Sequence, residues 1–189
     1  MATKTSELLG VAVPRTVALV RATGDDQLDL PTPCADYTVG GLINHVYDVA
    51  VNFQRLAAGQ ETDWSVKTDH VAEPGWRDRF AVEADRLVAA WEDPASEEGV
   101  APAMGLPRST IGLMGVVDLV VHGWDLARAT GQPYEPTPES VGALHRFMDE
   151  MGPTGRQMGA FGPEVPVDAA GTELDRLLGR TGRNPAWAG

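Results

Sequence analysis

The sequence predicts an all-α protein, a bundle of four main helices followed by one or two further helices near its C-terminal end. Proline and glycine divide the 189 residues into blocks whose apolar positions recur at helical spacing. Alternating β-branched residues are nearly absent, although short strands could form in the two long loops. With 43% hydrophobic residues the chain can bury one sizeable core. We therefore expect a single domain, residues 1–189, with residues 131–189 packed on the bundle as an extension.

The first two helices are defined by their ends and by their apolar faces. The first is predicted from about Ser6 to Ala22, and Pro14 should kink it. The second runs from about Thr38 to Ala58, since Thr38 can cap its N-terminus and Gly59 stops it. Its apolar residues form one continuous stripe that should face the core: Leu42, Ile43, Val46, Val49, Ala50, Phe53, Leu56 and Ala57.

The third helix is predicted from about Gly75 to Trp91, and an acidic connection, residues 93–99, follows it. The fourth runs from Ser109 to Thr130, where Gly131 ends it. Both blocks carry apolar residues at helical spacing, so both should contribute to the core.

The C-terminal third should hold the additional helices. A fifth helix has a strong start signal, with Thr137 as the cap, Pro138 at the first helical position and Glu139 in the first turn. A stretch rich in glycine and proline, residues 152–166, follows it. A short helix around residues 173–178 then completes the predicted set.

Composition excludes several classes of function. The 27 acidic and 15 basic residues give a net charge of −12, whereas a nucleic-acid binder needs a cationic face. Cys34 is the one cysteine, so no disulfide can form within the chain and a reducing compartment is expected. The first residues carry no apolar run behind a basic cluster, so we expect no signal peptide and a cytoplasmic protein. Its expected partners are a small-molecule substrate and, for a homodimer, a second copy, but neither nucleic acid nor a membrane.

The fourth helix has an unusual distribution of charge. Residues 109–127 contain no Lys, Arg or Glu, and the ionisable residues there are Asp118, His122 and Asp125. Because a helix has 3.6 residues per turn, positions i, i+4 and i+7 lie along one narrow face. Two carboxylates and an imidazole therefore project together from an otherwise apolar helix.

Two interpretations of this face are open. It could be the solvated side of an amphipathic helix, but such sides usually carry long Lys, Glu and Arg side chains. The wide apolar sector instead indicates a helix that is buried on several sides. A transmembrane span is excluded more firmly, since three ionisable groups near its middle would be costly.

A buried face of this kind predicts a metal site. Buried Asp118 and His122 are costly unless they are paired or bind an ion, and their spacing suits two ligands of one metal. His45, on the border of the second helix's apolar stripe, is the natural third ligand, although a structural histidine is the more common role for such a residue. Two histidines and a carboxylate with an open position suit Zn²⁺ best, or Fe²⁺, Ni²⁺ or Co²⁺.

Three separated motifs resemble one known family. The run from Asp118 to Gly131 contains HGWDLARATG, residues 31–46 resemble a TPC-x-x-W/Y-x-V-x-x-L-x-x-H segment, and residues 182–187 resemble a closing GRDPxW. These motifs are typical of an actinobacterial family of DinB-like proteins. That family is similar to the metal-binding domain of mycothiol-dependent maleylpyruvate isomerase.

The resemblance implies a DinB/YfiT-like four-helix bundle that holds a divalent metal through His45, Asp118 and His122. Two departures limit what it implies. The isomerase has Glu where this chain has Asp118, so ligation through the shorter side chain could be longer, indirect or absent. The isomerase also has a second, C-terminal domain, whereas here about 60 residues follow the metal helix; maleylpyruvate isomerisation itself is therefore not implied.

Other residues have weaker assignments. Asp125 could accept a hydrogen bond from a ligand histidine or cap a neighbouring loop. Cys34 could be a small buried residue, which we favour, or a thiol whose pKa is lowered by the following helix. Cys34 and Trp124 could border a thiol-binding region, although packing is the simpler role for Trp124. His70 and His145 are expected on the surface, and Trp187 should dock the C-terminus.

The expected function is that of a metal-dependent protein that uses a low-molecular-weight thiol such as mycothiol in thiol transfer or isomerisation. Whether it is an enzyme stays open, and no catalytic residue is singled out. A non-catalytic bundle is the alternative, binding a small ligand or forming a dimer, with Asp118, His122 and Asp125 as a hydrogen-bonded polar cluster. A third interpretation, a hydrolase using metal-bound water, lacks an obvious general base beyond Asp125.

Overall fold

The structure, a computed structural model, describes residues 3–189 and is an all-α bundle within that range. Its helices are α1 (Thr5–Ala22), α2 (Val39–Ala57), α3 (Trp76–Glu92), α4 (Arg108–Thr130), α5 (Pro138–Gln157) and α6 (Glu173–Arg180), with single turns η1 (Asp25–Gln27), η2 (His70–Ala72) and η3 (Pro94–Ser96). Two short antiparallel strands, β1 (Val100–Ala101) and β2 (Leu106–Pro107), precede α4. The predicted fold class is confirmed.

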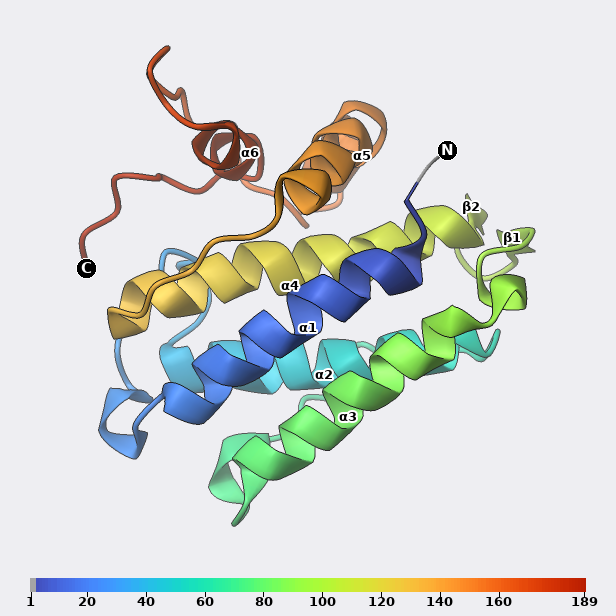
Figure 1. Cartoon of the computed structure of the whole chain (residues 1–189), viewed down its shortest axis with the longest axis horizontal. Helices are drawn as coiled ribbons and strands as arrows, with labels where there is room; N and C mark the ends of the chain where they lie inside the picture. The colour runs from blue at the N-terminus through green and yellow to red at the C-terminus, as the bar shows by residue number, and fades with distance from the viewer. Residues whose placement is uncertain (1–2) are drawn as a thin grey trace.

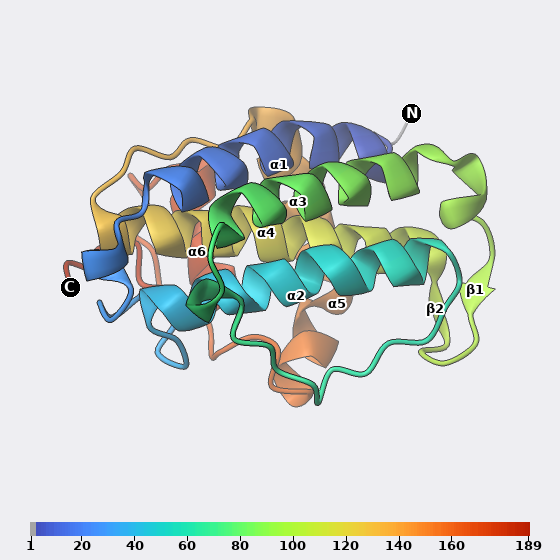
Figure 2. The ribbon, with the colours of Figure 1, turned by 90° about the horizontal axis from the view of Figure 1, so that it is seen from below.

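Helices α1 to α4 form the bundle. Both α1 and α2 pack against α3 and against α4 (Figures 1 and 2). Helices α5 and α6 lie outside this group of four, on the side of α4 (Figure 1), and α5 contacts α4 and α1. One continuous apolar core joins the four bundle helices to α5 and α6.

The helix ends follow local sequence signals. Thr38 Oγ1 accepts a hydrogen bond from the Gly41 amide at 3.3 Å, and Thr137 Oγ1 accepts one from the Ser140 amide at 3.2 Å. Gly131 ends α4 with φ +71°, a conformation that favours glycine. Helix α1 is unbroken through Pro14.

The end of α5 differs from the predicted one. The helix continues to Gln157, through the start of the stretch predicted to be irregular. Gly155 lies within this last part of the helix, and the Phe161 side chain packs so close to it that a Cβ there would be 2.4 Å from the ring. The glycine that ends α5 is Gly159, which has φ +77°, and the Ala160 amide donates to the Gly155 carbonyl at 2.8 Å across this turn.

Helix α4 is the central helix of the core. Its glycines allow close approach, since a Cβ on Gly112 would lie 2.8 Å from the Trp91 ring and one on Gly115 would lie 2.9 Å from the Phe53 ring. Helix α4 is long and apolar enough to span a membrane, but 78% of its most apolar window is buried inside the protein. The interpretation of its polar face as a solvated side is wrong, because His122 is 7% exposed and Asp125 is fully buried.

Candidate metal centre

Three of the predicted site residues meet between α2 and α4. Asp118 and His122 lie one turn apart on the face of α4 that packs against α2, and His45 approaches from α2. The Nε2 atoms of His45 and His122 each lie 3.6 Å from the same oxygen, Asp118 Oδ1. The two imidazole rings are nearly perpendicular, with centroids 4.8 Å apart. The shorter acidic side chain therefore reaches both histidines.

The spacing of these atoms fits a metal ion better than a hydrogen-bonded cluster. At 3.6 Å neither nitrogen is hydrogen-bonded to Asp118. Two ligands that bind one ion tetrahedrally, each about 2.1 Å away, lie about 3.4 Å from each other. One ligand atom from each of His45, Asp118 and His122 lies within 4.8 Å of the ligand atoms of the other two. The donor set, two imidazole nitrogens and one carboxylate, is one that Zn²⁺ accepts.

Asp125 fixes the opposite side of the His122 ring. Its Oδ2 lies 2.9 Å from His122 Nδ1, and both groups are buried. Burial lowers the pKa of His122, against the opposing effects of the Asp125 hydrogen bond and the Asp118 charge, so the ring is neutral. A neutral ring that donates from Nδ1 to Asp125 has its lone pair on Nε2, the atom that faces Asp118.

Arg183 is part of this network, and sequence reasoning missed it. Its Nε and Nη2 donate to Asp125 Oδ2 at 3.3 and 3.1 Å, and its Nη1 donates to the Thr181 carbonyl at 3.0 Å. Oδ1 of Asp125 is buried and has no hydrogen-bond partner within residues 3–189. The signal that could have indicated Arg183 is its place in the closing motif, residues 182–187.

Tyr37 is a second residue without a predicted role. Its ring stacks on His45 with centroids 5.1 Å apart, and it meets His122 edge-on at 6.2 Å. Burial, with the nearby Cys34 and Asp118 groups, raises the pKa of Tyr37, so its hydroxyl stays protonated. Tyr37 thus forms an aromatic wall beside both histidines.

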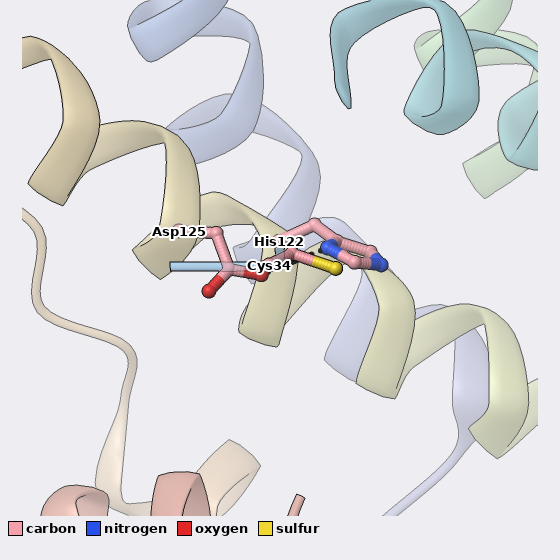
Figure 3. A group of neighbouring side chains, drawn as sticks. All are labelled: Cys34, His122 and Asp125. Atoms are coloured by element: carbon pink, nitrogen blue, oxygen red, sulfur yellow. Dashed lines mark hydrogen bonds and ion pairs between the residues drawn. The ribbon is translucent and has the colours of Figure 1, made fainter. Parts of the chain in front are cut away.

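Cys34 lies on the Asp125 side of His122 (Figure 3). Sγ of Cys34 and the ligand atoms of His122 and Asp125 are within 4.8 Å of one another, so they form a second candidate group for a metal. The Arg183 guanidinium already contacts Asp125 there, and its positive charge opposes a cation. Burial also raises the pKa of the Cys34 thiol, so the interpretation of Cys34 as a thiol of lowered pKa is wrong.

The remaining aromatic and histidine residues lie elsewhere. Trp124 is 6% exposed and belongs to the apolar core, about 200° around α4 from His122, which favours its packing role. His70 is not a free surface residue, because it pairs with Asp48 at 2.9 Å. His145 binds the Glu173 carbonyl at 3.0 Å. Arg128 donates to the carbonyl of Trp187 at 2.8 Å, which ties the C-terminal segment to α4.

A four-helix bundle in which two histidines and a carboxylate converge between two helices belongs to the class of bundles suited to hold a metal ion. Residues 9–127 match the family described as the mycothiol maleylpyruvate isomerase N-terminal domain, and this chain belongs to that family. Two relatives in Mycobacterium tuberculosis, the uncharacterized proteins MT0763 and Rv0738, are each 34% identical over 179 residues, covering 88% of this chain and 92% of the relative. No solved structure matches the chain. The suspected family is thereby confirmed.

Proposed function

We propose that this protein binds one divalent transition metal ion, Zn²⁺ in the first instance, through His45, Asp118 and His122. The observation that carries the proposal is the placement of both Nε2 atoms 3.6 Å from a single Asp118 oxygen. Among residues 3–189, none of these three ligand atoms has a hydrogen bond, although His122 Nδ1 has one on the other side of the ring. Fe²⁺, Ni²⁺ and Co²⁺ suit the same donors.

We further propose that the co-substrate is a low-molecular-weight thiol of the mycothiol type, as the family description suggests. Three protein ligands leave an open position, and a bound metal would lower the pKa of a thiol and hold it as a thiolate. Tyr37 would flank that position and shield it from water on the side of His45. The reaction class would be thiol transfer or thiol-assisted isomerisation on a small-molecule substrate, in the cytoplasm.

The hydrolase interpretation has less support. It needs a general base, and Asp125 was the residue available for that role. Asp125 is fully buried, and its Oδ2 is engaged by His122 and Arg183. A carboxylate held in this way positions a histidine and does not abstract a proton from a water molecule at the metal.

Metal content tests the first part of the proposal. Protein without a His-tag is reconstituted with Zn²⁺, dialysed and analysed by inductively coupled plasma mass spectrometry. We expect about one ion per chain in the wild type and a large loss in His45→Ala and His122→Ala. His145→Ala is the matched control, because His145 lies on α5 and contacts Glu173 instead. Equal metal content in all four proteins, or none in the wild type, would contradict the proposal.

Spectroscopy of a cobalt form tests the second part. We expect mycothiol, added to Co²⁺-loaded protein, to produce a thiolate-to-metal charge-transfer band. An S-methylated derivative cannot form a thiolate and should produce none. A spectrum that is unchanged by the thiol in protein that does bind Co²⁺ would remove the thiol from the proposal and leave the metal site intact.

A further inference from the structure

We infer that Arg183 is a positioning residue of the metal centre: through Asp125, it holds the His122 ring with Nε2 turned toward His45 and Asp118. This inference rests on the proposed metal site and adds a part that the family match does not contain. The matched segment ends at residue 127, and Arg183 lies 58 residues beyond Asp125. The C-terminal segment thus supplies a contact that the bundle alone lacks.

The guanidinium of Arg183 is held from two sides. Two of its nitrogens donate to Asp125 Oδ2, and the third donates to the Thr181 carbonyl at 3.0 Å. The Arg183 side chain is 10% exposed and that of Asp125 is fully buried. A planar group with fixed donor directions, bound at both ends in a dry environment, cannot change orientation without losing contacts.

The backbone that delivers Arg183 is equally constrained. After α6, the Arg183 amide donates to the Leu178 carbonyl at 2.9 Å, which closes a tight turn. Gly182 in this turn has φ +86°, and a Cβ there would lie 2.7 Å from the Cα of Gly162. Only glycine fits such a position without strain. The turn therefore sets the direction in which the guanidinium points.

The consequence for His122 follows from the hydrogen bonds of Asp125. Oδ2 accepts from both the imidazole and the guanidinium, whereas Oδ1 has no partner among the described residues. Without Arg183, the carboxylate would lose all its contacts except the one to His122, and it could turn. The preference of His122 for a proton on Nδ1 would then weaken, and Nε2 would no longer be held as a ligand.

Arg183→Gln and Arg183→Lys test the inference in the full-length chain. Arg180→Gln is the matched control, because Arg180 also ties the C-terminal region to α5, through Asp149 at 2.7 Å, and does not contact Asp125. Two readouts are compared: the Zn²⁺ dissociation constant from competition with a chromophoric chelator, and the His122 tautomer in metal-free protein from long-range ¹H–¹⁵N NMR. A merely structural role would leave the tautomer unchanged.

We expect Arg183→Gln to weaken Zn²⁺ binding about 10- to 100-fold and to mix the His122 tautomers. Arg183→Lys should recover part of both effects, and Arg180→Gln should match the wild type. Should the Gln variant fail to fold, the Lys variant carries the comparison, since lysine keeps the positive charge but its single nitrogen cannot replace the three nitrogens that donate from Arg183. Wild-type affinity and an unmixed tautomer in the folded Arg183 variants would overturn the inference. Absence of Zn²⁺ binding in the wild type would refute the proposed function instead. The His122 tautomer in metal-free protein would then still show whether Arg183 orients the ring.

Discussion

Asp125→Asn should destabilise the metal-free protein far more than its small chemical change suggests. The substitution keeps the shape of the side chain but removes the negative charge opposite the buried Arg183 guanidinium, 3.1 Å away. Leaving one partner of a buried ion pair uncompensated costs about 3–5 kcal/mol, and the amide oxygen can still accept one bond, so we expect about 3 kcal/mol. For a domain of this size each kcal/mol lowers Tm by about 2–4 °C, which gives a decrease of roughly 6–12 °C.

Thermal unfolding followed by circular dichroism, with EDTA present, measures this effect without a contribution from bound metal. Asp149→Asn is the control, since Asp149 also pairs with an arginine of the C-terminal region, Arg180, but its side chain is 69% exposed. An exposed pair contributes about 0–1 kcal/mol, so that variant should unfold within a few degrees of the wild type. Equal Tm values for the two variants would refute the reasoning that burial makes the Asp125 contact strong.

Three further outcomes are expected. The free energy of unfolding of the metal-free protein should fall as pH drops below about 6.5, because burial lowers the pKa of His122 and the unfolded chain then binds a proton that the native chain does not. Urea titrations of the wild type and of His122→Gln at several pH values measure this dependence. An equal change in unfolding free energy with pH in the two proteins would contradict the prediction. Gly112→Ala should lower the free energy of unfolding by about 1–3 kcal/mol, because the added Cβ overpacks against Thr5 and Trp91. Gly10→Ala, with open space around it, should raise the free energy of unfolding by about 0.5–1 kcal/mol. Chemical denaturation measures both changes, and a change of the same sign in the two variants would contradict the prediction. Iodoacetamide should alkylate Cys34 more slowly in folded protein than in urea, because burial raises the pKa of the thiol; equal rates by mass spectrometry would contradict the burial.

The fold could be predicted from sequence wherever local chemistry decides an element. Thr38 and Thr137 cap helices in the structure as their positions indicated, and Gly131 ends α4. The end of α5 is predicted too early, because glycine and proline from residue 152 onward indicate an end, whereas the helix continues to Gln157 and stops just before Gly159, which has φ +77°. Helical periodicity does not show which of several neighbouring glycines ends a helix.

The site residues likewise differ in whether a local rule could predict them. Helical spacing predicted that Asp118 and His122 share a face, because that relation depends only on 3.6 residues per turn. The position of His45 beside them depends on the packing of α2 against α4. The apolar stripe of α2 predicted that this helix packs in the core, but not which helix it packs against. Arg183 could not be placed by spacing at all, since no local rule links residues 58 positions apart. Tyr37 occupies the W/Y position of the motif in residues 31–46, but its stacking on His45 could not be predicted, because that contact depends on the loop before α2.

The three ionisable groups on the polar face of α4 differ in what offsets their charge or their burial, and this difference supports a metal role for Asp118. Burial keeps His122 neutral, and Arg183 balances the charge of Asp125. Asp118, whose side chain is 29% exposed, has no hydrogen bond and no cationic side chain of Lys or Arg within reach among residues 3–189. Two nitrogen atoms face it at equal distance, too far to donate to it. A cation between these three atoms would bind the carboxylate and both imidazole nitrogens together, which no side chain among residues 3–189 does.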